Sequence, residues 1–240
     1  MRGRPAAKRK SRRRSPWRKA ASTILIAILV GPALIFACYG LVPPPVTPLM
    51  LIRAAEGHPY DYRWRPLSRI SPHLARSVIA AEDNLFCQHW GFDFHQIREV
   101  LRDWEAGENP RGASTISMQT VKNLLLWPER RIARKLLEIW LTPQLELLLT
   151  KRRVLEIYLN IVEMGPGIYG AEAAAQRYFG KPAADLTATE AALLAAILPA
   201  PHDWSATAPS PYINERVDVI RRRIDQLGPM LDCAVPRSRS

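Results

Sequence analysis

The sequence predicts a mainly α-helical domain preceded by one N-terminal transmembrane helix. Residues 21–42 carry no charge, and about 20 apolar residues are enough to cross a bilayer as a helix. Downstream, apolar residues recur three and four positions apart, which is the spacing of one helix face. The alternating patterns that predict strands are scarce. These three observations favour a helical protein with little sheet.

The positive charge of the chain is concentrated before this apolar segment. Residues 1–20 contain ten Lys or Arg and no acid, which leaves 24 basic and 22 acidic residues elsewhere. Basic flanks stay on the cytoplasmic side of a membrane, so we expect a basic cytoplasmic tail at 1–20 and export of the residues after 42. Because the body is nearly neutral despite a net charge of +12, nucleic acid is not an expected partner.

A cleaved signal peptide is the alternative interpretation of the apolar segment. The apolar region of a signal peptide is usually about 7 to 15 residues long, and no small-x-small cleavage site follows this segment cleanly. We therefore predict a transmembrane helix at 21–42. Cys38 would lie within it, either facing lipid or packed.

The rest of the chain divides by composition. Several prolines follow the apolar segment, and residues 43–66 are predicted to form a Pro-rich linker with a stiff, extended start. Residues 67–231, roughly 165 residues, are enough for one folded domain with a buried core. Residues 232–240 are predicted to be a frayed tail.

Eight helices are expected within the folded domain. The first begins at the pair Ser71-Pro72, because proline is favoured at the first helical position. Pro143 is expected to break a longer helix. Thr187 and Glu190 have the spacing of a capping box. The expected helices cover residues 71–81, 95–104, 117–125, 132–149, 152–159, 168–179, 187–198 and 212–227.

Two adjacent acids, Glu82 and Asp83, follow a run of four apolar residues. A carboxylate at the end of an apolar helix is partly desolvated, which raises its pKa and makes it a better general base near neutral pH. An acid in water at a helix end is the alternative, because charged residues are mostly exposed. The residues His89, Trp90 and Asp93 are interpreted as scaffolding around Glu82.

A second polar group lies in a hydroxyl-rich turn that leads into a helix. Backbone N–H groups at a helix start, together with hydroxyls, an amide and a lysine, suit an anionic ligand such as phosphate. An ordinary capped helix is the alternative. The G-x-x-x-x-G-K spacing of a P-loop is absent. The candidate residues are Ser114, Thr115, Gln119, Lys122 and Asn123.

A third group, Arg134, Lys135 and Glu138, has spacings of three and four and therefore shares one helix face. A solvated, salt-bridged surface is the usual explanation, worth about 0.3 to 0.5 kcal/mol per pair. Together with the two groups above, however, these cations suit a reaction at a sugar linked to diphosphate. Three polar residues further along are interpreted as packing and hydrogen-bonding structure: Glu156, Tyr158 and Asn160.

Two of the three cysteines, Cys87 and Cys233, lie outside the apolar segment. An oxidising compartment would allow a disulfide between them, but two thiols so far apart in the sequence give little reason to expect one. No Cys or His spacing is typical of a metal centre, so no metal ligand is assigned.

Five motifs occur in a fixed order between residues 67 and 201. They are E-D-x-x-F-x-x-H-x-G-F-D at 82–93, G-A-S-T-I-S-x-Q-x-x-K-N at 112–123, R-K-x-x-E at 134–138, R-V-L-E-I-Y-L-N at 153–160 and A-A-Q-R-Y-F-G-K at 174–181. Together they resemble the peptidoglycan glycosyltransferases of glycosyltransferase family 51, of the monofunctional Gram-negative type.

This resemblance implies a lysozyme-like helical domain on the periplasmic face of the cell inner membrane, with a small mobile lobe that dips into lipid. The implied substrates are lipid II and the lipid-linked growing glycan chain. The implied product is a β-1,4-linked glycan, formed with inversion and release of undecaprenyl diphosphate. Other cell-wall synthesis or division proteins would be further partners besides the membrane.

The resemblance also implies roles for the candidate residues. Glu82 would be the general base toward the 4-hydroxyl of the acceptor, and Glu138 would help to stabilise the reacting diphosphate. No cofactor is required, although a divalent ion, Mg²⁺ or Mn²⁺, has a place at the diphosphate. The cations that would neutralise the leaving group are Lys122, Arg134 and Lys135. The residues that would orient substrate or support the cleft are Asp83, Ser114, Thr115, Gln119 and Asn123.

The sequence departs from the commonest family pattern at Met118, where many members carry the first of two glutamines. A thioether cannot replace both hydrogen-bonding functions of an amide, so only Gln119 is assigned a role. Bifunctional relatives add a transpeptidase with a Ser-x-x-Lys nucleophile. This spacing is absent from the sequence, and transpeptidation is not expected.

Two alternative functions remain at this point. A hydrolase or lytic transglycosylase of lysozyme-like fold also uses two carboxylates. The cations argue against it, because cleavage of a neutral glycan needs no cationic surroundings for its leaving group. A membrane scaffold without enzymatic activity is the second alternative, and it would have no need of Glu82.

Overall fold

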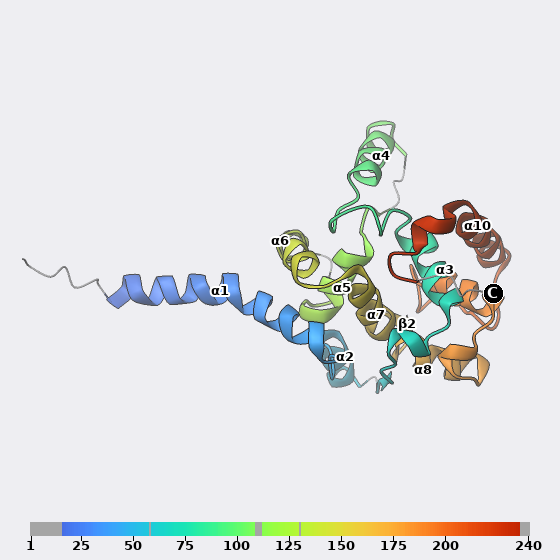
Figure 1. Ribbon diagram of the computed structural model, residues 1–240, viewed down its shortest axis with the longest axis horizontal. Helices are drawn as coiled ribbons and strands as arrows, with labels where there is room; N and C mark the ends of the chain where they lie inside the picture. The colour runs from blue at the N-terminus through green and yellow to red at the C-terminus, as the bar shows by residue number, and fades with distance from the viewer. Residues whose placement is uncertain (1–15, 58, 109–111, 130, 236–240) are drawn as a thin grey trace, which may run out of the picture.

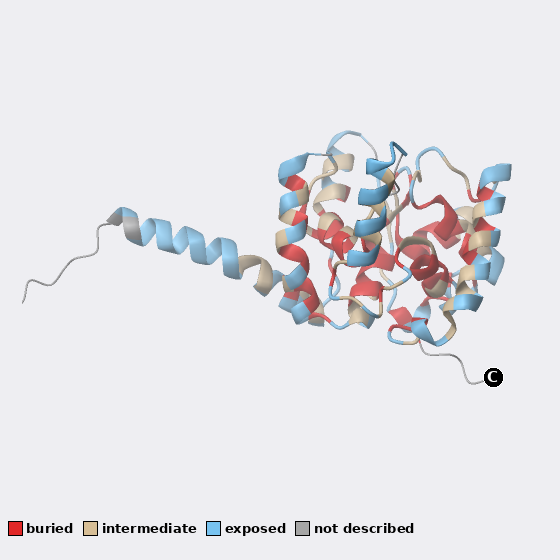
Figure 2. Ribbon diagram, turned by 90° about the horizontal axis from the view of Figure 1, so that it is seen from above, coloured by how far each residue is buried: buried red, intermediate tan, exposed pale blue. Residues whose placement is uncertain are grey.

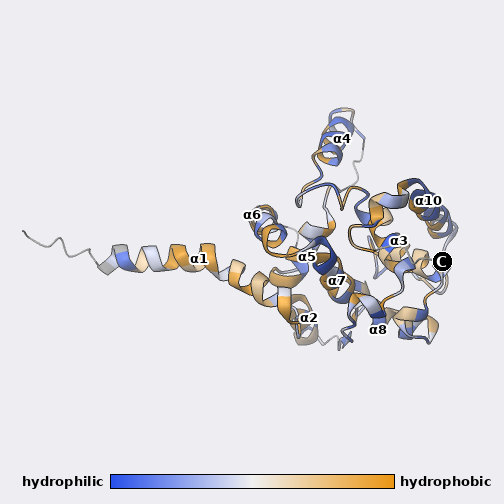
Figure 3. Cartoon of the chain, in the orientation of Figure 1, coloured by the Kyte–Doolittle hydropathy of each residue, from blue (hydrophilic) through white to orange (hydrophobic). Residues whose placement is uncertain are grey.

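The computed structural model describes residues 16–57, 59–108, 112–129 and 131–235, and it begins with a long helix, α1 (Pro16–Leu41). The helix projects from the body of the protein, and its apolar residues are mostly exposed (Figures 1 and 3). The segment Lys19–Leu41 is long and apolar enough to cross a membrane, as a membrane anchor or a signal sequence would be. The predicted apolar helix is therefore present; the basic tail lies mostly outside the described residues.

The C-terminal end of α1 is fixed to the body of the protein. Arg153 donates one hydrogen bond to the carbonyl of Tyr39 (2.8 Å) and another to the carbonyl of Val42 (2.8 Å). Phe36 of α1 is completely buried, and the helix also packs against α6. Because carbonyl groups at a helix end lack partners within the helix, the guanidinium both satisfies them and ties α1 down.

The stretch 43–66, predicted to be a linker, is part of the fold. It contains the helix α2 (Pro48–Ala55) and the strand β1 (Asp61–Tyr62). Thr47 caps α2 by accepting a hydrogen bond from the backbone of Met50, and Met50 is completely buried. Pro48 starts a helix here because proline is well tolerated at the first helical position, so the Pro-rich composition was misleading.

All eight expected helices are confirmed, with ends within two residues of the predicted positions. They enclose one buried core, which Figure 2 shows in red. A small three-stranded sheet has the order β1-β3-β2, with β1 and β3 parallel. The bounds are α3 Pro72–Glu82, α4 Phe94–Glu105, α5 Ile116–Leu125, α6 Ile132–Leu148, α7 Lys151–Ile161, β2 Glu163–Gly165, β3 Ile168–Tyr169, α8 Gly170–Phe179, α9 Ala188–Ile197 and α10 Pro211–Leu227.

The helices form two packed groups. In one group α3, α9 and α10 contact each other, and in the other α5 contacts both α6 and α7. The predicted capping box of Thr187 and Glu190 is confirmed at the start of α9. Pro143 was expected to break its helix, but it lies inside α6 without breaking it. Its neighbours Leu141 and Leu145 are buried, and this tertiary packing outweighs the local penalty of a proline.

The interpretation of α7 as a structural helix is confirmed. The carboxylate of Glu156 accepts a hydrogen bond from the backbone N–H of Leu67 (2.7 Å). Asn160 accepts one from the backbone N–H of Arg65 (2.7 Å) and donates one to its carbonyl (2.8 Å). These bonds hold the chain between β1 and α3 against α7.

A disulfide joins Cys87 to Cys233, which are 146 residues apart. This bond corrects the expectation from the sequence, which could not place two cysteines so far apart next to each other, because only the tertiary fold brings them together. The expectation of a frayed tail is wrong for 232–235, where Ala234 and Val235 are buried. Arg76 donates a hydrogen bond to the carbonyl of Val235 (3.0 Å). Residues 236–240 lie outside the described part of the chain.

Helix α4 stands apart from the rest of the domain, as Figure 1 shows at the top of the view. None of its residues is buried, and Asp93 caps it by accepting a hydrogen bond from the backbone of Gln96 (2.9 Å). Phe94 and Trp104 expose most of their surface. Trp90, just before the helix, is 73% exposed, so it does not serve as scaffolding around Glu82 as expected.

The disulfide leads to a prediction about stability. We expect that replacing Cys87 and Cys233 by serine lowers the free energy of unfolding by about 2 to 5 kcal/mol, because the bond closes a long loop and restricts the unfolded chain. Thermal and urea unfolding of the purified protein with and without reductant measures this. Cys38→Ser is the matched control, since Cys38 is an exposed free thiol. Three titratable thiols in the unreduced protein would contradict the assignment.

Candidate active site

Glu82 lies at the C-terminal end of α3, a helix whose preceding residues are mostly buried. The side-chain amide of Gln119, on α5, donates a hydrogen bond to the Glu82 carboxylate (2.8 Å). The hydroxyl of Tyr158, on α7, donates in turn to the amide oxygen of Gln119 (3.0 Å). Tyr158 is completely buried. Three helices therefore fix the orientation of one carboxylate.

Burial raises the pKa of Glu82 above its ordinary value, and the nearby Asp83 adds to this effect. The hydrogen bond from Gln119 and the charges of Arg216 and Lys122 act in the opposite direction without cancelling it. The interpretation as a freely solvated acid at a helix end is thereby excluded. A partly desolvated carboxylate with a raised pKa is suited to take a proton near neutral pH.

Asp83 is only 3% exposed and is held between two parts of the chain. One carboxylate oxygen accepts a hydrogen bond from the backbone N–H of Ile116 at the start of α5 (2.9 Å). The other lies 2.8 Å from Nε2 of His89. The expected scaffolding role of His89 is therefore seen in this contact. Asp83 joins the end of α3 to the beginning of α5.

The start of α5 does not offer an open anion site, as the sequence suggested it would. Thr115 caps the helix by accepting a hydrogen bond from the backbone of Met118 (3.2 Å), and its hydroxyl donates to the carbonyl of Gly91 (2.6 Å). With Asp83 bonded to Ile116, the partial positive charge of this helix end is matched by an internal carboxylate. Any anion has to be bound by side chains.

Those side chains are supplied by α6. Glu138 is 3% exposed, and its two oxygens are paired with Arg134 and with Lys135 (3.1 Å to the latter). Lys135 also donates a hydrogen bond to the hydroxyl of Ser114 (2.9 Å), and Arg134 donates one to the carbonyl of Glu129 (2.7 Å). The shared helix face is confirmed, but Arg134 and Glu138 are buried and only Lys135 is substantially exposed, so it is not a solvated surface.

Lys122 on α5 adds a third cation to this network. Burial lowers the pKa of Lys122, while the charge of Glu138 counteracts this, and Arg134 and Lys135 lower it further. The three cations outnumber the one buried carboxylate among them. A site with this charge favours an anionic ligand, whose binding would relieve the repulsion between the cations.

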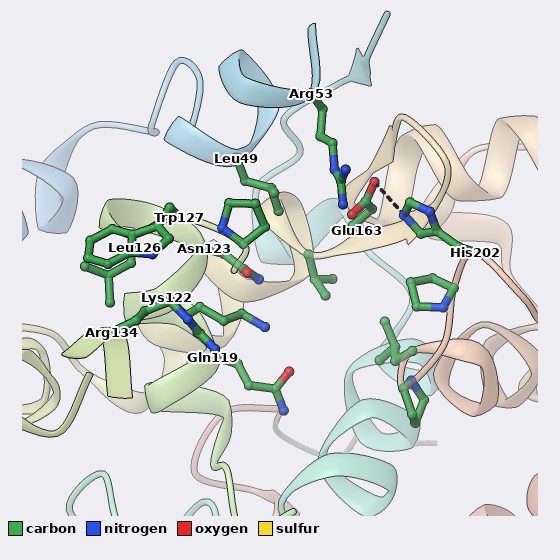
Figure 4. A pocket seen from close by; sticks show the side chains of 15 residues that line it. Leu49, Arg53, Gln119, Lys122, Asn123, Leu126, Trp127, Arg134, Glu163 and His202 are labelled. Carbon is green, nitrogen blue, oxygen red and sulfur yellow. Dashed lines mark ion pairs between the residues drawn. The ribbon is translucent and has the colours of Figure 1, made fainter. Parts of the chain in front are cut away.

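Two of these cations, Lys122 and Arg134, border a cavity of about 300 Å³ (Figure 4). Gln119, Lys122 and Asn123 line it from α5, and Arg134 lines it from α6. Gln119 connects this cavity to Glu82, because its amide is bonded to that carboxylate. The opposite wall carries an ion pair between His202 and Glu163 (3.1 Å).

All ten residues singled out in the sequence lie at the end of α3, in the turn before α5, on α5 or on α6. Three further residues belong to the site but were not predicted to do so from the sequence. Arg216 on α10 acts electrostatically on Glu82, Tyr158 orients Gln119, and Arg53 on α2 lines the cavity. Arg53 and Arg216 lie outside the quoted motifs and reach the site from elements distant in the chain, whereas Tyr158 was interpreted from the sequence as hydrogen-bonding structure only.

The residues around Glu138 do not fit a divalent metal ion. Both oxygens of this carboxylate are already engaged by cations, which would repel a further cation. Among the described residues, no group of three or more His, Cys, Asp or Glu side chains is placed to hold a metal. We therefore derive no chemical step through a metal ion.

A mainly helical domain with a partly desolvated carboxylate beside a cation-lined cavity suits a transferase that takes a proton from an acceptor and stabilises an anionic leaving group. Comparison with known proteins agrees with this class. Residues 50–225 match the family model described as transglycosylase, and the chain belongs to this family.

Similar proteins cover most of the chain. A biosynthetic peptidoglycan transglycosylase of Caulobacter vibrioides is 50% identical over 197 residues, which are 82% of this chain and 86% of the relative. The protein of the same description from Rhodospirillum centenum is 52% identical, covering 83% of this chain and 89% of the relative. The one from Aeromonas hydrophila is 48% identical, covering 85% and 89%.

The contacts of Asp83 lead to a prediction about stability. We expect Asp83→Ala to lower the free energy of unfolding by about 3 kcal/mol, because it leaves the Ile116 N–H and His89 without their charged partner. Asp93→Ala is the matched control, since it removes only the cap of the projecting helix α4 and should cost about 1 kcal/mol. Urea unfolding compares the two. Equal losses would show that Asp83 is not the structural link described above.

Proposed function

We propose that this protein is a peptidoglycan glycosyltransferase that polymerises lipid II into β-1,4-linked glycan strands for cell-wall synthesis. The observation that carries the proposal is the position of Glu82, which is bonded through Gln119 to the edge of a cavity with a cationic wall. The transglycosylase family and the printed descriptions of the relatives support it.

Glu82 acts as the general base. It accepts the proton of the 4-hydroxyl of lipid II, the acceptor, while that oxygen attacks C1 of the lipid-linked growing chain. A new C–O bond forms on one face of the sugar, and the bond from C1 to the diphosphate oxygen breaks on the other. The configuration is inverted, and the electron pair leaves with undecaprenyl diphosphate. The raised pKa of Glu82 suits this proton transfer.

The cations of the site stabilise the leaving group. Negative charge grows on the diphosphate as its bond to C1 breaks, and fixed positive charge in a water-poor site stabilises it. Lys122, Arg134 and Lys135 supply this charge. Glu138 acts by holding two of these cations on one helix face before substrate binds. The expected divalent ion, Mg²⁺ or Mn²⁺, has no part in this proposal.

The remaining candidate residues bind substrate or support the cleft. Ser114, Gln119 and Asn123 orient substrate; Gln119 and Asn123 line the cavity, and the hydroxyl of Ser114 contacts Lys135. Asp83 and Thr115 support the cleft by holding the start of α5. This division follows from the lining of the cavity for Gln119 and Asn123 and from the hydrogen bonds of Ser114, Asp83 and Thr115.

The protein is proposed to be a single-pass protein of the cell inner membrane, with its N-terminus in the cytoplasm and its catalytic domain in the periplasm. The basic residues before α1 support this orientation. The disulfide between Cys87 and Cys233 supports it independently, because such bonds persist in oxidising compartments. The exposed aromatic side chains of α4 suit the lipid-dipping lobe. Other wall-synthesis or division proteins stay predicted partners.

The hydrolase alternative is less well supported by the charges of the site. Cleavage of a glycan by water releases a neutral sugar hydroxyl, which needs no surrounding cations. Three cations around one buried carboxylate instead match a diphosphate. The scaffold alternative offers no reason for the network that orients Glu82.

The activity is tested with the purified full chain, detergent and lipid II. We expect polymer to form, and we expect Glu82→Gln to reduce kcat by about 10² to 10⁴-fold at an unchanged melting temperature, because the amide cannot accept the proton. Gel separation of labelled glycan measures the polymer. Shortening of preformed glycan without consumption of lipid II would favour the hydrolase, and full turnover by Glu82→Gln would refute the assignment of the base.

The hydrogen bond of Gln119 predicts a pH dependence. Glu82 works in its ionised form, so kcat/KM should rise with pH through a pKa above the ordinary value for glutamate. Gln119→Leu removes a hydrogen bond that favours the ionised form, so the pKa rises further and the acid limb moves to higher pH. Tyr158→Phe should shift it less, in the same direction. The control Gln176→Leu, on α8, should leave the acid limb of the kcat/KM profile where it is. If Gln119→Leu and Tyr158→Phe also leave it there, Gln119 does not set the pKa of Glu82.

A further inference from the structure

Arg53 brings a cation to the active-site cavity from a part of the chain that the sequence motifs do not include. It lies on α2 and lines the cavity together with Lys122, Gln119 and Arg134. Figure 4 shows its side chain reaching toward the cavity from the α2 side, whereas Lys122 and Gln119 approach from α5. The cavity is therefore cationic on two facing walls.

The guanidinium of Arg53 has a hydrogen-bond donor that no described residue accepts from. Its Nη1 donates to Glu56 (2.9 Å), but its buried Nε has no hydrogen-bond partner among the described residues. A buried N–H without a partner costs free energy, and a shift of the side chain toward a bound anion would remove this cost. The side chain remains 32% exposed, so a ligand can reach it.

Among the described residues that line the cavity, Glu163 is the one carboxylate, and it already has partners. Glu163 is paired with His202 (3.1 Å), and it accepts a hydrogen bond from the hydroxyl of Tyr169 (3.2 Å). The hydrogen bond to Glu56 and the charges of Glu163 and Glu56 raise the pKa of Arg53, so Arg53 faces the cavity as a cation, and Lys122 lines the same cavity. A volume of about 300 Å³ is at the lower end of ligand sites and can hold a diphosphate with the first atoms attached to it.

The position of Arg53 along the chain also matches a lipid-linked ligand. Six residues separate the end of α1 at Leu41 from the start of α2 at Pro48. Arg153 fixes the last turn of α1 to the body, so α2 is held close to the point where α1 would leave a membrane. The diphosphate of a polyprenyl-linked sugar lies at the same level, where its lipid chain enters the bilayer.

We propose that Arg53 is a substrate-binding residue that, together with Lys122, holds the diphosphate of a lipid-linked substrate in this cavity. This rests on the function proposed above and adds to it a contact from the segment next to the membrane. The diphosphate belongs either to lipid II as acceptor or to the growing chain as donor. Both present the same chemistry to a guanidinium, which binds phosphate oxygens through parallel N–H groups.

A structural role for the pair of Arg53 and Glu56 is the competing explanation. The two side chains are 32% and 47% exposed, and ion pairs at such sites contribute little to stability. The variant Glu56→Gln separates the two roles, because it removes the ion pair and keeps the guanidinium. If the pair is structural, Arg53→Gln and Glu56→Gln should show the same loss of activity. If Arg53 binds substrate, only Arg53→Gln should show it.

The test uses the full chain in detergent, primed with a preformed lipid-linked tetrasaccharide. Lipid II is titrated at saturating primer, and primer is titrated at saturating lipid II. We expect Arg53→Gln to raise the KM of one substrate about tenfold while kcat changes less than twofold, with Arg53→Lys intermediate. A rise for lipid II assigns the cavity to the acceptor, and a rise for the primer assigns it to the donor. Glu56→Gln should leave both values within twofold of the unaltered protein.

Inhibition by inorganic pyrophosphate gives a second measurement, and Arg53→Gln should weaken it by a similar factor. Unchanged KM values and unchanged inhibition in both Arg53 variants would overturn the inference, as would a Glu56→Gln variant that reproduces the defect. Melting temperatures show whether each variant is folded, and if Arg53→Gln does not fold, Arg53→Lys decides. If the unaltered chain does not polymerise lipid II, the proposed function itself fails.

Discussion

The buried carboxylate of Asp83 is the link on which the geometry of the site depends. Asp83 directly follows the last residue of α3, and its carboxylate is held at the start of α5. One oxygen accepts a hydrogen bond from the N–H of Ile116, while the other contacts His89. Glu82, the proposed base, lies immediately before Asp83, and Gln119 lies one turn into α5 after Ile116. A single hydrogen-bond acceptor therefore sets the distance between the proposed base and the helix that carries Gln119 and Lys122.

The second constraint is the balance of charge around Glu138. Three cations brought together without a counter-charge would repel each other strongly at the low dielectric of a buried site. Glu138 reduces this repulsion by pairing with Arg134 and Lys135, and the helical spacing of three and four residues makes both pairs possible at once. The cations are thereby placed before substrate arrives, which spares the reaction the cost of assembling them.

Local signals were sufficient for most of the helices and for the residues of the ordered motifs. The Ser71-Pro72 start, the capping box at Thr187 and the helical spacing on α6 depend only on neighbours in the chain. Tertiary contacts decided the rest. The partner of Cys87 lies 146 residues away, Pro143 is tolerated because Leu141 and Leu145 are buried, and Arg53 reaches the cavity because Met50 anchors its helix.

The hydrogen bonds from Arg153 to the last turn of α1 have a consequence for how the protein responds to its bilayer. A helix held in this way cannot swivel independently of the domain. With α1 in a bilayer, a thinner or thicker hydrocarbon layer changes the tilt of the helix, and the tilt is passed on to the domain. For the membrane-anchored protein proposed above, the height of the cavity over the headgroups would then depend on membrane thickness, which makes lipid composition a mechanical influence on the site.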